Sequence, residues 1–289
     1  MIAISPAQQR NWDWRAAGNF VCGGTGTGLM AFAACAAWLG APRFEPAALA
    51  ALAIVGLGLF LVWLEIGRPW RFANVFRNPA TSWMSREAWV AALFFPMGAL
   101  GAVLGSPAVI TVAALLGLVF LLCQTFMLRA AKGIPTWRSA SLSPLIFATG
   151  LTEGAGLLLA ASASMHSPPQ WLAISVLVLV LWRTVLMLAY AYRLRGRRAP
   201  DAARPGLKLM TAIVALPAGL LPALLLIAPL PGTGTIAAIA SGLLAAAGGW
   251  CLKYMLVCTL AYTQGFAIEH SPARGPVPAG PGARPGWSR

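Results

Sequence analysis

Eight long apolar runs, each close to the length that crosses a bilayer, constrain the fold of this chain more than any other feature. They occupy residues 16–39, 47–66, 86–104, 107–128, 144–163, 169–194, 207–228 and 236–262. A helix of about 20 apolar residues spans the hydrocarbon core, and backbone groups in lipid need internal partners. The sequence therefore predicts an all-α, polytopic membrane protein with eight transmembrane helices, arranged as two four-helix bundles.

The composition excludes an ordinary soluble domain. Hydrophobic residues make up 59% of the 289 residues and charged residues only 10%, whereas about 25% charged is typical of soluble domains. A formal charge of +14 would favour nucleic acid in a soluble chain, but here the basic residues fall between the apolar runs and form no single patch. We therefore expect membrane lipid, and no nucleic acid, around this chain.

The two ends of the chain differ in composition from the apolar runs. The first 15 residues are polar and rich in tryptophan, without the short apolar region and cleavage site of a signal peptide. The last residues are rich in Pro and Gly, a composition typical of disorder. We expect an eight-helix membrane domain over residues 1–270 and a disordered tail over residues 271–289.

The basic residues between the apolar runs, or at their ends, lie almost entirely on one side of the predicted helices. On that side are Arg10, Arg15, Arg68, Arg71, Arg77, Arg86, Arg129, Lys132, Arg138, Arg193, Arg195, Arg197, Arg198, Arg204, Lys208, Arg274, Arg284 and Arg289. Only Arg43 lies on the opposite side. Because Lys and Arg are enriched in cytoplasmic loops, both termini are predicted to face the cytoplasm, with the chain in the cell inner membrane.

The loop from Glu65 to Glu87 combines carboxylates with several arginines between two membrane helices. One interpretation is structural, since Arg-rich loops commonly fix helix orientation. The other is chemical: Glu65 ends one apolar run and Glu87 begins the next, and carboxylates at membrane depth usually handle protons, ions or ligands. Arg68, Arg71 and Arg86 would favour the ionised form of these carboxylates.

Three further charges, Glu153, Arg183 and Lys253, lie inside predicted helices. They form either a structural network that neutralises itself or a proton path toward the middle of the bilayer. A third interpretation is the solute site of a secondary transporter. Against it, the charge-rich and aromatic-rich region lies at one face, whereas transporters usually bind at the midplane with repeated broken helices.

The residues that hold haem and iron–sulfur clusters are scarce. His166 and His270 lie in a predicted outer loop and in the tail, so no intramembrane histidine pair can ligate a b-type haem. The five cysteines all lie in apolar runs without C-x-x-C spacing. We expect no haem and no iron–sulfur cluster in this chain, so that electrons would come from a partner.

Short motifs stand at the basic ends of the predicted helices. They are Leu64–Pro69, Ser82–Glu87 and Pro135–Trp137. They resemble the NrfD-like family of membrane subunits, which includes the polysulfide-reductase subunit and the DMSO-reductase (DmsC-like) anchor. The stretches NWDWRAAGNF and Lys253–Ala267 are most similar to the membrane subunit of phenylacetyl-CoA:acceptor oxidoreductase.

This resemblance implies an eight-helix anchor that carries no cofactor of its own. Such an anchor exchanges electrons between membrane quinone (ubiquinone or menaquinone) and a ferredoxin-like iron–sulfur subunit. That subunit serves a molybdopterin catalytic subunit with molybdenum or tungsten. The arginine pattern places these partner subunits on the cytoplasmic face. A purely structural anchor stays an alternative.

The resemblance also implies roles for individual residues. In the family, the acid of an S-x-E motif at the start of the third helix belongs to the quinol site, and it corresponds to Glu87. Many members carry histidine where this chain has Glu65, which leaves open whether Glu65 takes over the proton role. The family's quinone head group lies near the start of the first helix, which implicates Asn19. We add Trp137, from the third motif, and Arg68, Arg71 and Arg86 of the loop to the expected quinone site.

Overall fold

The computed structural model describes residues 5–40, 44–165, 168–195, 198–228, 232–265, 268–271 and 280–283. Within these residues, eight helical spans are long and apolar enough to cross a membrane. The prediction of an all-α multi-pass membrane protein is thus confirmed, and most span limits agree with the predicted ones within a few residues.

The α-helices are α1 (Trp14–Trp38), α2 (Glu45–Glu65), α3 (Trp83–Leu104), α4 (Pro107–Ala130), α5 (Leu142–Met165), α6 (Gln170–Arg193), α7 (Arg204–Ala215), α8 (Leu221–Ile227) and α9 (Gly234–Tyr254). The short elements are the 3₁₀ helices η1 (Pro69–Arg77) and η2 (Asp201–Ala203), the π-helical turns η3 (Leu216–Leu220) and η4 (Met255–Thr259), and the strands β1 (Ile268–Ser271) and β2 (Gly280–Ala283). The seventh span runs from η2 through α8, and the eighth comprises α9 and η4.

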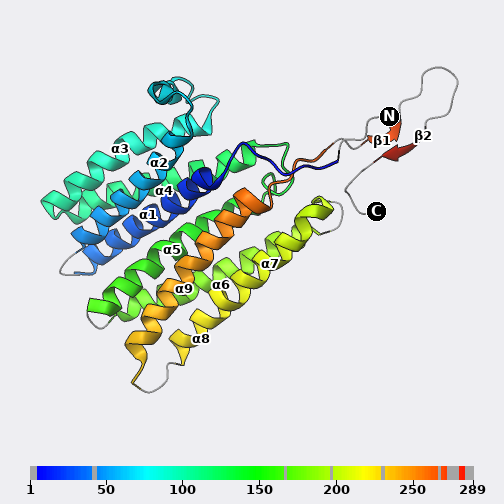
Figure 1. Cartoon of the computed structure of the whole chain (residues 1–289). Helices are drawn as coiled ribbons and strands as arrows, with labels where there is room; N and C mark the ends of the chain where they lie inside the picture. Colours follow the sequence, from blue (N-terminus) through cyan, green and yellow to red (C-terminus); the bar gives the residue numbers. More distant parts are fainter. Residues whose placement is uncertain are drawn as a thin grey trace.

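The helices form two groups that meet along α1 and α5. Figure 1 shows α1 to α4 on one side of the molecule and α5 to α9 on the other, as the two-bundle prediction requires. At the junction, a Cβ added to Gly28 or Gly154 would overlap the backbone of the opposite helix. Glycines at these positions let α1 and α5 approach closely, which is how membrane helices associate without a hydrophobic driving force.

Side-chain caps mark where two helices on the basic side, α1 and α3, begin. Ser82 accepts a hydrogen bond from Ser85 N at 3.3 Å and caps α3. Asp13 accepts one from Arg15 N at 2.8 Å and caps α1. An N-cap side chain satisfies a backbone donor that the helix itself leaves free. Because of its cap, α3 starts before the apolar run, and Glu87 lies in its second turn.

Three prolines lie inside the third and seventh spans and affect them differently. Helix α3 continues as an α-helix through Pro96. Pro217 lies in the π-helical turn η3, and Pro222 stands at the start of α8. A proline removes one backbone donor and crowds the preceding turn. The seventh span changes from α-helix to a π-helical turn at its prolines, whereas the third span stays α-helical.

The segments before α1 and after η4 run together. Gln9 N donates to Ala261 O, and Thr263 N donates to Ala7 O, each at 2.8 Å. Beyond them, β1 and β2 pair antiparallel. Most of the predicted tail lies outside the described residues, so its disorder stays a prediction. Also outside them lie Arg43, His166, Arg197, Arg274, Arg284 and Arg289.

Candidate functional site

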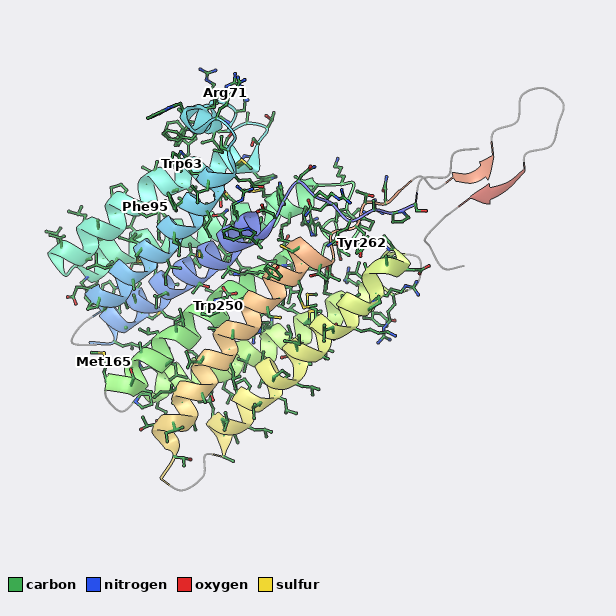
Figure 2. The ribbon with its side chains drawn as sticks, in the orientation of Figure 1. Trp63, Arg71, Phe95, Met165, Trp250 and Tyr262 are labelled. Atoms are coloured by element: carbon green, nitrogen blue, oxygen red, sulfur yellow. The ribbon has the colours of Figure 1, made fainter. Side chains whose placement is uncertain are left out.

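A cavity of about 770 Å³ lies where α1, α2, η1 and α3 meet. Its polar lining residues include Asn19, Glu65, Arg71 and Glu87, and the rest of its wall is mostly aromatic and aliphatic. Figure 2 shows the lining residues Trp63, Arg71 and Phe95 on the side of the molecule formed by α2, η1 and α3. Small-molecule sites are commonly apolar clefts of this size with a few convergent polar groups.

The short helix η1 covers the cavity at the basic end of the bundle. Phe72 and Phe76 of η1 line the cavity, whereas Trp70 is 90% exposed. Trp89 of α3 fixes the helix, because its Nε1 donates to Phe76 O at 3.1 Å and the two rings meet edge to face. The loop therefore covers the cavity with apolar side chains, while the exposed Arg71 borders the cavity and Arg77 faces away from it.

Glu87 is the buried carboxylate of this cavity, with only 4% of its surface exposed. The side chains of Gln124 and Asn19 interact with Glu87, and Gln124 Nε2 donates to Asn19 O at 3.2 Å. Among the described residues, Glu87 Oε1, Asn19 Oδ1 and Gln124 Oε1 have no hydrogen-bond partner. Buried polar atoms are nearly always satisfied, so these three oxygens mark a place where a ligand or water would bind.

Glu65 lies half-buried at the end of α2 and also lines the cavity. Its charged neighbours are Asp13 and Arg15. Arg15 donates to Leu64 O at 3.0 Å and forms an ion pair of 2.8 Å with Asp13. Hydrogen bonding by Arg15 lowers the pKa of Asp13 below its usual value, so this pair stays ionised beside Glu65.

Three residues expected in the quinone site do not line the cavity. Arg68 is exposed. Arg86 donates to Pro79 O and Ala80 O, each at 2.7 Å, and its guanidinium stacks 4.1 Å above the Trp83 ring.

Trp137 lies behind the cavity wall. It is buried, and its Nε1 donates to Leu256 O at 2.9 Å. Its ring packs 5.0 Å from that of Trp12, which does line the cavity. Trp137 therefore supports the wall through Trp12.

The three intramembrane charges are fully buried. Glu153 and Lys253 lie where α5 and α9 contact α1, and Arg183 lies among α6, η3 and α9. Lys253 Nζ donates to Glu153 Oε2 at 2.6 Å, and Thr25 Oγ1 donates to the same oxygen at 2.9 Å. Trp250 in turn donates to Thr25 Oγ1 at 2.9 Å, and Figure 2 shows it in the middle of the molecule. Glu153 thereby connects α5 to α1 and α9.

Arg183 is bonded differently. Its Nη1 and Nη2 donate to the carbonyl oxygens of Ala245 and Ala218, each at 2.6 Å. Pro222 has no N–H and cannot donate to Ala218 four residues before it, which frees that carbonyl for Arg183. The proline in the seventh span thus provides an acceptor for a buried arginine.

Glycines make room for the buried charges. A Cβ at Gly24 would overlap Lys253 Nζ, and one at Gly249 would lie 2.6 Å from Glu153 Cγ. One position before Gly24, a Cβ at Gly23 would overlap the Gln124 amide. Adjacent glycines of α1 therefore contact the polar cluster at the cavity and the buried ion pair.

Sequence reasoning missed four residues of these clusters: Trp12, Arg15, Thr25 and Gln124. Gln124 interrupts the apolar stretch LLCQTF, and a lone amide at membrane depth is a usable signal. Trp12 and Arg15 carried no such signal, because their positions depend on the cap at Asp13.

The comparison with protein families decides the class of this protein. The family described as polysulphide reductase, NrfD, matches residues 4–263. The chain belongs to the NrfD family. NrfD subunits are membrane subunits of polysulphide-reductase and DMSO-reductase-type complexes, and they typically interact with quinone. No curated protein matches the chain. The resemblance to the family is thereby confirmed, while that to the phenylacetyl-CoA:acceptor oxidoreductase subunit stays a prediction.

Proposed function

We propose that this NrfD subunit is the quinone-reactive anchor of a molybdopterin iron–sulfur oxidoreductase, and that the cavity under η1 is its quinone site. One observation carries the proposal: Glu87 is buried in the wall of a mostly apolar cavity of about 770 Å³, with Oε1 unpaired.

The residues present fit a flat aromatic ligand with oxygens at its rim. The cavity offers aromatic walls from Phe60, Phe76 and Phe95, and the unpaired side-chain oxygens of Asn19 and Glu87. The quinone–quinol couple would exchange two electrons and two protons at the ring oxygens of a molecule bound there, and the unpaired oxygens of Asn19 and Glu87 would accept from quinol hydroxyls. An acceptor for those protons has to lie within hydrogen-bond reach.

In this proposal Glu87 accepts the proton, and Asn19 orients the ligand through its amide. Glu65, which is half-buried, passes protons toward the basic face of the protein. There the positive charges of Arg15 and Arg71 favour the ionised form of a carboxylate. The buried pair Glu153–Lys253 extends this route toward the middle of the membrane as a proton path. Gln124, beside the cavity, and Lys253, of the ion pair, lie next to the adjacent glycines Gly23 and Gly24 of α1, which supports this connection.

The contacts of the three buried charges do not favour a transporter. Glu153 and Lys253 bond each other, and Arg183 uses both terminal nitrogens on carbonyl oxygens. The large cavity lies at the charged face and is not lined by these charges, whereas transporters bind their solute at the midplane.

We place the partner subunits, a ferredoxin-like iron–sulfur protein and a molybdopterin catalytic protein, on the cytoplasmic face of the inner membrane. The basic loops would dock acidic partner surfaces there. The similarity of the N-terminal stretch and of Lys253–Ala267 to the phenylacetyl-CoA:acceptor oxidoreductase subunit supports a partner that acts on a CoA thioester. Affinity purification should bring iron, sulfide and molybdenum or tungsten with the chain; a chain that purifies alone contradicts this assembly.

Filling the cavity tests the site without touching a carboxylate. Ala88 of α3 lines the cavity, and Ala99 of the same helix is exposed and does not. Ala88→Phe should lower quinone-linked turnover of the purified complex at least tenfold and leave electron transfer to a dye at the iron–sulfur subunit unchanged. Ala99→Phe is the matched control. Equal quinone-linked turnover in the two variants would show that quinone binds elsewhere.

A further inference from the structure

A second pocket, of about 390 Å³, lies at the basic end of α4, outside the quinone cavity. It is lined by Trp83, Phe126, Arg129, Ala130, Lys132 and Arg138. The Trp83 and Phe126 rings stack with centroids 4.5 Å apart, and the Arg129 guanidinium lies 5.8 Å from the Phe126 ring. The pocket thus combines a rigid aromatic floor with three cationic side chains.

These cations have no anionic partner within the part of the chain that the structure describes. The salt bridges there join Arg15 to Asp13, Arg204 to Asp201 and Lys253 to Glu153. The pocket lining itself contains no carboxylate. Like charges gathered in one pocket repel each other and are stabilised by a bound anion.

The position of the pocket indicates where that anion comes from. Exposed apolar side chains run along one face of α4 toward Phe126: Val112, Leu115, Val119 and Leu122. Their spacing of three and four residues makes one continuous stripe on a helix. The stripe faces lipid and ends at the pocket, so a molecule with an anionic head and an acyl chain would contact both.

We propose that this pocket binds the headgroup of an anionic phospholipid, with an acyl chain along the α4 stripe. Arg129, Lys132 and Arg138 hold the phosphodiester, and the Trp83–Phe126 pair contacts the glycerol region at the interface. Basic pockets between transmembrane helices on the cytoplasmic side commonly bind such headgroups. The inference does not depend on the quinone assignment.

Native mass spectrometry of the full chain in detergent tests the proposal, with phosphatidylglycerol and phosphatidylcholine added in equal amounts. Each basic residue near a membrane surface favours anionic lipid roughly fivefold. The wild-type chain should therefore retain phosphatidylglycerol with a preference of at least tenfold. The variant Arg129→Gln/Lys132→Gln/Arg138→Gln should retain the two lipids about equally. Because Lys132 and Arg138 are exposed, the double variant of these two is the fallback if the triple variant does not fold.

A charge-matched control is Arg193→Gln/Arg195→Gln/Arg198→Gln at the end of α6, which should keep most of the preference. Equal loss in the control and pocket variants would mean general attraction and would overturn the site. Displacement of phosphatidylglycerol by 10 mM inorganic phosphate would show a free-phosphate site without acyl-chain binding. Unchanged lipid retention with loss of a copurified iron–sulfur subunit would show a protein-docking surface. Either result would overturn the lipid assignment.

Discussion

Lys253 Nζ lies 2.6 Å from Glu153 Oε2, and both side chains are completely shielded from solvent. This ion pair joins α5 to α9 at a depth where isolated charges are very unfavourable. The guanidinium of Arg183 lies nearby and donates to two backbone carbonyls. The three side chains thus comprise one acidic and two basic groups.

Replacing Glu153, the one acid among these three charges, should destabilise the protein. Glu153→Gln leaves Lys253 buried without its counter-ion, a defect that typically destabilises by about 3–5 kcal/mol. We expect less assembled protein and a lower unfolding temperature in detergent, measured by size-exclusion chromatography and differential scanning fluorimetry. Adding Lys253→Met to the variant should restore much of the loss, because both charges are then gone.

The same variant separates the two roles of the pair. Normal assembly with lost quinone-linked turnover would identify Glu153 as part of a proton path. Normal assembly and normal turnover would mean that Glu153 serves neither role.

Glycine substitutions test whether the buried pair is tightly enclosed. Gly249→Ala places a methyl group against the Glu153 side chain, and overpacking of this kind costs about 1–3 kcal/mol. Gly234→Ala in the same helix is the control, since nothing lies within 4 Å of its added Cβ. Thermal unfolding in detergent should show a clear decrease for Gly249→Ala and little change for Gly234→Ala. Equal stability of the two would mean that the region around Glu153 relaxes easily.

Orientation is the prediction on which the face of the quinone site depends. The positive-inside rule places both termini in the cytoplasm. A C-terminal alkaline phosphatase, active only outside the cytoplasm, should stay silent, while a C-terminal green fluorescent protein should be fluorescent. Strong phosphatase activity would reverse the topology and move the cavity to the outer face.

The sequence predicted the helices well because hydropathy over 20 residues is a strong local signal. It placed Asn19, Glu65, Arg71 and Glu87 in one site, and the structure brings all four to one cavity. Whether this cavity binds quinone stays a prediction.

Other features depend on tertiary packing, which no local pattern reports. Arg86 bonds Pro79 O and Ala80 O, so its side chain does not join the cavity wall as its sequence neighbour Glu87 does. The freed carbonyl of Ala218 could be anticipated from Pro222, but its pairing with Arg183 on another helix could not.

The central claim is that Glu87 accepts the proton of a quinol bound in the cavity under η1. Glu87→Gln keeps the shape and hydrogen-bonding capacity of the side chain but removes the base. The complex should assemble with its iron–sulfur clusters intact, as electron transfer to an artificial dye would show. Glu45→Gln, at the opposite end of α2, is the matched control and should behave as wild type.

The decisive measurement is quinone-linked turnover of the assembled Glu87→Gln complex at saturating quinol. The account predicts a decrease of roughly 10²–10⁴-fold, the range typical for loss of a general base, with dye-linked activity unchanged. Quinone-linked turnover equal to that of the wild-type complex would contradict the assignment of Glu87 as the proton acceptor and, with it, the proposed site.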